Sequence, residues 1–102
     1  MIINENPQPD DSIVENLREQ ARRGVPVGEL VRLLHSWLGG GEHKKVAIVF
    51  HFMSAFSLSL RDARVIEGLP LLGGDAISEE KLDMALRPLI QKGLRANAAA
   101  DV

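Results

Sequence analysis

The sequence predicts an all-α fold, a single compact domain of four to five short helices. Three observations support this fold class. Apolar residues recur at helical spacing in segments 11–23, 26–38 and 78–92. Glycine follows each of these segments, and serine or proline stands at its start, as is typical of helix ends and helix starts. No pair of strand-like segments is joined by a hairpin turn, so a sheet lacks partner strands.

Length, composition and charge limit the classes of function. A chain of 102 residues suits one domain. The absence of cysteine excludes disulfides, thiol catalysis and cysteine-based metal sites. A net charge of -2 disfavours general nucleic-acid binding. The first residues lack the basic and apolar regions of a signal peptide, and no apolar run approaches a membrane span. We therefore expect a cytoplasmic protein that does not bind membranes.

Composition along the chain predicts three parts. Residues 1–10 combine prolines, asparagines and acidic residues and are expected to form a flexible N-terminal arm. Residues 11–94 are expected to form the helical domain. Residues 95–102 are rich in alanine and follow a glycine, so we expect a flexible C-terminal tail.

The first helix is predicted to start near Asp11 or Ser12. Ser12 can accept hydrogen bonds from free backbone amides, and Glu15 follows three positions later, as in a capping box. Gly24 is expected just beyond the end of this helix. The apolar residues on one side are Ile13, Val14, Leu17 and Ala21.

The second helix is predicted to carry Pro26 in its first turn, where proline loses no hydrogen bond. Three glycines at 39–41 are expected to end it and to form a joint. The residues expected to face the core are Val27, Leu30, Val31, Leu34, Trp37 and Leu38.

The segment Lys45–Phe52 is ambiguous because its run of β-branched residues favours a strand. Periodicity over so short a run does not separate a buried strand from a buried helix. Since a lone strand would leave its backbone groups unpaired, we predict a buried helix from about Glu42 to Phe56. Its expected inner face carries Val46, Val49, Phe50 and Met53, and His51 is expected on the outer side.

The remaining elements are a short helix, a loop and a last helix. Ser57 or Ser59 is predicted to cap the short helix, with Leu60, Ala63 and Ile66 facing inward. The loop 68–74 contains three leucines and is expected to fold back on the core. The last helix should start at Ser78, kink or restart at Pro88, and end at Gly93.

The motif search predicts no enzyme, no cofactor and no metal. The three histidines, at positions 35, 43 and 51, are spaced eight apart, whereas metal-binding pairs on a helix are three or four apart. A helix-turn-helix that binds DNA through Arg61 and Arg64 is one alternative, with Ser59 to Gly68 as its reading helix. Asp62 and Glu67 would then also face the phosphates, which argues against it.

An acidic segment is the main functional lead. Five carboxylates lie between positions 67 and 83 against one cation, Lys81. The segment forms either an ordinary solvated face or a patch that binds a basic partner protein. Neighbouring leucines at 71 and 72 would supply apolar contact area. The predicted partner-binding residues are Glu67, Leu71, Leu72, Asp75, Glu79, Glu80 and Asp83.

The segments "GVPVGELVRLL", "FHFMSAFSLSLRDARVI" and "ISEEKLDMALRPLI" together resemble the small bacterial immunity proteins encoded beside polymorphic toxins. Those of contact-dependent growth inhibition systems are included. The resemblance covers roughly residues 12–92 and depends on core leucines and turn glycines. It implies a non-enzymatic inhibitor that binds a cognate toxin domain and covers its active site. Many such toxins are basic nucleases, which suits an acidic face. A homodimer joined through the apolar central helix is a third alternative.

Overall fold

The computed structural model describes residues 9–40 and 44–100, and it confirms the all-α prediction. The described residues form five α-helices and two short 3₁₀ turns, η2 and η3, between α4 and α5. Their bounds are α1 Asp11–Arg22, α2 Val27–Trp37, α3 Lys45–Phe56, α4 Leu60–Ala63, η2 Arg64–Gly68, η3 Pro70–Leu72 and α5 Glu79–Ala100.

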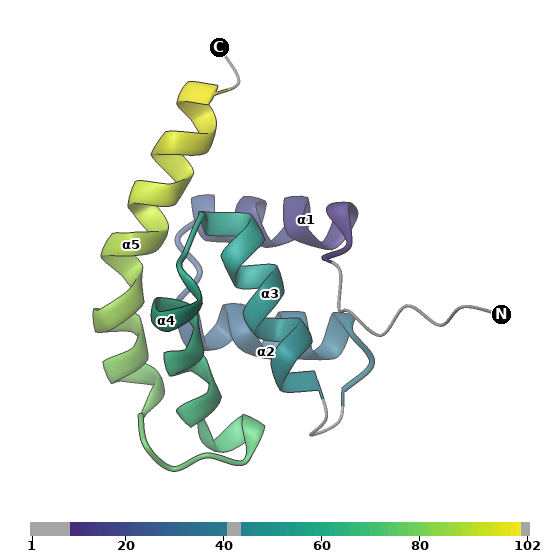
Figure 1. Ribbon diagram of the computed structural model, residues 1–102, viewed down its shortest axis with the longest axis vertical. Coiled ribbons are helices and arrows are strands. Elements are labelled where there is room, and N and C mark those ends of the chain that lie inside the picture. The colour runs from purple at the N-terminus through teal and green to yellow at the C-terminus, as the bar shows by residue number, and fades with distance from the viewer. Residues whose placement is uncertain (1–8, 41–43, 101–102) are drawn as a thin grey trace, which may run out of the picture.

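The helices pack around one hydrophobic core. Both α2 and α3 lie against α1 and α5. Figure 1 shows α5 along one side of the other helices, with its last turns extending past them. None of the helices in the described part of the chain combines the length and hydropathy that crossing a membrane requires. The largest fully buried side chains are Phe52, Phe56, Leu17, Leu30, Leu34, Ile48, Ile66, Leu69, Leu72, Leu82, Leu86 and Val31.

Helix α1 begins after a different capping residue from the one predicted. The side chain of Asp10 accepts hydrogen bonds from the amides of Ser12 and Ile13, so Asp10 is the N-cap. The capping box of Ser12 and Glu15 is wrong, because Glu15 pairs instead with Arg18. The rest of the predicted arm, residues 1–8, lies outside the described residues.

Helix α3 confirms the choice of helix over strand for Lys45–Phe56, and its predicted start at Glu42 falls outside the described residues. The predicted inner face is partly wrong. Val46 is 53% exposed, whereas His51 is buried. Because α3 is apolar on nearly all sides, its own sequence does not select a face. The packing of α1 and α5 makes the selection and buries Ile48 and Phe52.

Two polar contacts attach α1 to α3. The buried His51 ring accepts a hydrogen bond from the Asp10 amide at Nε2, 3.1 Å away, while Nδ1 lies 2.6 Å from the Ala47 carbonyl oxygen. The Arg18 guanidinium donates to the carbonyl oxygens of Ser54 and Ala55 at the C-terminal end of α3. A cation there also complements the negative end of the helix dipole.

The segment after α3 folds as predicted in part. Ser59 caps α4 by accepting a hydrogen bond from the Asp62 amide, and Leu69 and Leu72 return to the core. Leu60 is 47% exposed, so its predicted inward position is wrong. The α4 helix is a single turn that passes into η2, so the reading helix of a helix-turn-helix is not formed over 59–68.

The prediction that Gly93 ends the last helix is wrong. Helix α5 begins after Ser78, whose side chain accepts a hydrogen bond from the Lys81 amide, and it continues to Ala100. It neither stops nor restarts at Pro88, whose ring is exposed. Gly93 is buried inside the helix. A Cβ there would overlap the backbone of Phe56, so this glycine allows α5 to approach the end of α3 closely.

Candidate functional site

A groove between α2 and the first turns of α5 contains much of the acidic segment. Its volume is about 580 Å³. A smaller hollow of about 220 Å³ shares three of its residues and continues it towards η3. We call the two together the α2–α5 groove. Its lining residues are Pro26, Gly28, Glu29, Arg32, Leu69, Pro70, Leu71, Ser78, Glu79, Glu80, Asp83, Met84 and Arg87.

Two arginines neutralise part of the groove, one through a contact between helices and both through pairs within their own helix. Arg32 on α2 pairs with both Glu29 and Glu79, and Arg87 pairs with Asp83 at 2.8 Å. Four carboxylates and two guanidinium groups line the groove, which leaves an excess of two negative charges. Glu80 is exposed and forms no ion pair with any residue that the structure describes. The groove is therefore acidic, but less so than the sequence segment by itself.

Asp83 has a structural role in the groove. Helix α2 follows Pro26, which offers no side chain to cap the free amides. The Asp83 Oδ1 atom accepts a hydrogen bond from the Val27 amide, 2.8 Å away, and thereby caps α2 from a different helix. Two hydrogen bonds from Arg87 fix the carboxylate. These Arg87 contacts, and then the Val27 amide, lower the pKa of Asp83 despite its partial burial.

The lowered pKa of Asp83 predicts a stability that falls in acid. The ordinary pKa of 3.8 applies to the unfolded chain, so the contribution of ionised Asp83 is fully present above that value. It is lost as the pH falls through the lower folded pKa. We expect Asp83→Asn to lose less unfolding free energy than the wild type between about pH 6 and about pH 2. Urea unfolding at each pH measures the slope of the unfolding free energy against pH.

The control for this pH dependence is Asp75→Asn, which removes an exposed loop carboxylate. It should leave the slope as in the wild type. A slope for Asp83→Asn equal to that of the wild type would contradict the assignment. The Asp10 cap, whose pKa is also lowered by its hydrogen bonds to Ser12 and Ile13, is present in both variants.

Two exposed apolar side chains border the α2–α5 groove. Met84 on α5 is 71% exposed, and Leu71 on η3 is 40% exposed. Methionine is unbranched and adapts to differently shaped partners. An acidic groove with apolar side chains at both ends is a composition found at protein interfaces.

The structure brings four of the seven predicted partner-binding residues into the groove: Leu71, Glu79, Glu80 and Asp83. The other three lie elsewhere. Leu72 is fully buried in the core and offers no surface to a partner, which corrects its predicted role as an apolar anchor. Glu67 lies in a separate hollow beside Val46 and Leu60, and Asp75 lies beside Lys81.

Three of the groove residues that the sequence did not predict are Met84, Arg32 and Arg87. Met84 carried a usable signal, since it lies two positions from the inward Leu82 and so falls on the outer side of α5. Arg87 also carried a local signal, because Asp83 precedes it by four positions on the same helix, whereas the contact of Arg32 with Glu79 had none. The ion pair between Arg32 and Glu79 spans 47 positions, and only packing of α2 on α5 creates it.

The groove contains ion-paired and solvent-facing carboxylates. Within residues 9–40 and 44–100, no group of three histidine, cysteine or acidic side chains is arranged to hold a metal ion.

Comparison with protein-family models, with curated proteins and with solved structures found no match to this chain.

Proposed function

We propose that this protein is a non-enzymatic protein-binding module that acts in the cytoplasm as an immunity protein. In this proposal it neutralises a cognate bacterial toxin by covering the active site of the toxin domain. The observation that carries the proposal is the exposure of Met84 and Leu71 beside an acidic groove. The resemblance of three sequence segments to immunity proteins supports the choice of partner.

The proposed mechanism is steric and electrostatic. The excess negative charge of the groove increases the rate of association with a basic toxin surface. Met84 and Leu71 then enter apolar depressions of the partner and supply contact area. Glu80 forms new ion pairs, since its carboxylate has no cationic partner among the described residues.

The test uses the toxin domain encoded by the neighbouring open reading frame. Calorimetry measures its affinity for the wild-type chain, and survival of bacteria that co-express both proteins measures neutralisation. We expect Glu80→Lys and Met84→Asp each to weaken binding by at least about tenfold. Both side chains are exposed, so neither change should unfold the domain.

The matched control is Glu67→Lys, which reverses a charge of the same acidic segment in a separate hollow. Its ion pair with Arg64 lies on the surface and contributes little to stability. We expect wild-type affinity for this variant. If Glu80→Lys and Met84→Asp bind as the wild type does, the α2–α5 groove is not the interface. A neighbouring frame that encodes a metabolic enzyme would contradict the immunity function itself.

A further inference from the structure

A second hollow lies between the C-terminal half of α5 and the turn that joins α1 to α2. We call it the α1–α5 cleft. Its volume of about 380 Å³ lies within the size range of ligand pockets. Its apolar lining comes from three elements and includes Ala21, Val25, Leu30, Ile90 and Leu94. The cleft can therefore take up an apolar side chain and remove it from water.

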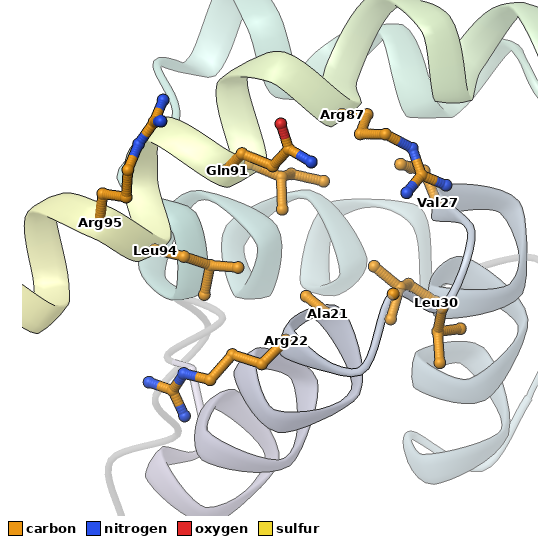
Figure 2. A pocket seen from close by; sticks show the side chains of 11 residues that line it. Ala21, Arg22, Val27, Leu30, Arg87, Gln91, Leu94 and Arg95 are labelled. Atoms are coloured by element: carbon orange, nitrogen blue, oxygen red, sulfur yellow. The ribbon is translucent and has the colours of Figure 1, made fainter.

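The charged side chains that line the α1–α5 cleft are all cationic. Figure 2 shows Arg22 and Arg95 at one end of the cleft, on opposite walls with their guanidinium groups pointing apart, and Arg87 beside Val27 at the other end. Arg87 is already bound to Asp83, and Arg22 has a weak ion pair with Glu19 at 3.6 Å. Arg95 forms no ion pair within the part of the chain that the structure describes. The free positive charge is therefore greatest at the Arg22–Arg95 end.

The part of α5 from position 84 onward has a consistent sign of charge. Positions 84–100 contain the cations Arg87, Lys92 and Arg95 and no acidic residue. The negative end of a helix dipole attracts cations only within the last turn, and the last turn of α5 contains none. The dipole does not explain why two of these arginines line an apolar cleft together with an arginine of α1.

We propose that the α1–α5 cleft binds an acidic segment of a partner protein. One apolar side chain of that segment enters the cleft, and two flanking carboxylates bind the guanidinium groups of Arg95 and Arg22, one on each wall. Arginine suits this role because its planar group donates two parallel hydrogen bonds to a carboxylate. Phosphate groups of a nucleic acid would meet the arginines but would leave the apolar floor unused, so the cleft favours a peptide.

This site is independent of the proposed function. Residues of α2 and the side chain of Arg87 line both the cleft and the α2–α5 groove. The two hollows nevertheless carry net charges of opposite sign. The groove therefore binds a basic surface and the cleft binds an acidic one. These two surfaces belong either to different parts of one partner or to two different proteins. Failure of either proposal leaves the other as it stands.

The test measures fluorescence anisotropy of a labelled synthetic peptide of glutamate and leucine on the full chain at low salt. Two comparison peptides replace every glutamate by lysine or every leucine by serine. We expect both comparison peptides to bind at least about tenfold more weakly, because each lacks one of the two chemistries. Arg95→Glu should weaken binding of the first peptide by at least about tenfold. Amide chemical shifts should change at Ala21 and Leu94.

The matched control is Lys92→Glu, which makes the same charge change on an exposed side chain of α5 outside the cleft. We expect a loss of no more than about threefold, from long-range electrostatics only. An equal loss for Lys92→Glu and Arg95→Glu would overturn the proposal. So would equal binding of the serine-containing peptide, or tighter binding of a single-stranded oligonucleotide that also depends on Arg95.

Discussion

Gly93→Ala is expected to destabilise the domain by about 2–3 kcal/mol, which lowers the melting temperature by roughly 10–20 °C. Helix propensity alone predicts the opposite, a gain of about 1 kcal/mol, because alanine is a better helix former than glycine. The tertiary structure reverses the sign. A methyl group at position 93 would overlap the backbone of Phe56, which cannot rotate away as a side chain can.

Thermal and urea unfolding of Gly93→Ala measure this effect. Gln91→Ala is the control, since it places alanine on the exposed side of the same helix two positions earlier. Its stability should stay within about 0.5 kcal/mol of the wild type. A Gly93→Ala variant as stable as the wild type would mean that α5 does not approach α3 as closely as the structure shows.

Substitution by alanine should affect stability far more at Leu72 than at the adjacent Leu71. Leu72→Ala is expected to cost about 3 kcal/mol of unfolding free energy, because it empties a fully buried site in the core. Leu71→Ala should cost no more than about 0.5 kcal/mol, since this side chain is 40% exposed. Urea unfolding of the two variants measures the difference directly.

Binding to the proposed toxin partner should show the reverse order. Leu71→Ala is expected to weaken the affinity, whereas Leu72→Ala should retain it at temperatures where the variant is folded. Comparable unfolding free energies for the two variants would contradict the burial of Leu72. Unchanged affinity for Leu71→Ala would remove this residue from the interface.

The structure also changes which residues are suitable for testing the acidic segment. From the sequence alone, charge reversal at Glu79 and Asp83 is the natural experiment. In the fold, Asp83 caps α2 and pairs with Arg87, and Glu79 pairs with Arg32. Reversal at these positions would damage the packing of α2 on α5, so a loss of binding would not identify an interface. Glu80 has no such role.

The presence of helices and their approximate bounds were predictable, because both depend on the pattern of residues within a short segment. The periodic leucines of α2 and α5, the glycine after α1 and the serine before α4 all act within a few residues. The helix in segment 45–56 was also predictable, although only from the lack of a partner strand. The face that α3 buries was not predictable, because this helix is apolar on nearly every side. Packing against helices that are distant in the sequence selects the buried face.

The amino-acid sequence was sufficient to predict the all-α class, the order of the helices, the return of loop 68–74 to the core and an acidic segment beside it. Packing of the helices is what buries Leu72 and leaves Leu71 exposed, places Gly93 against α3, and brings Arg32 of α2 to Glu79 of α5. The two groups of properties differ in the distance along the chain between the residues that interact. Periodicity, charge composition and ion pairs within one helix depend on neighbouring residues, whereas burial and ion pairs between helices depend on atoms that only packing brings together.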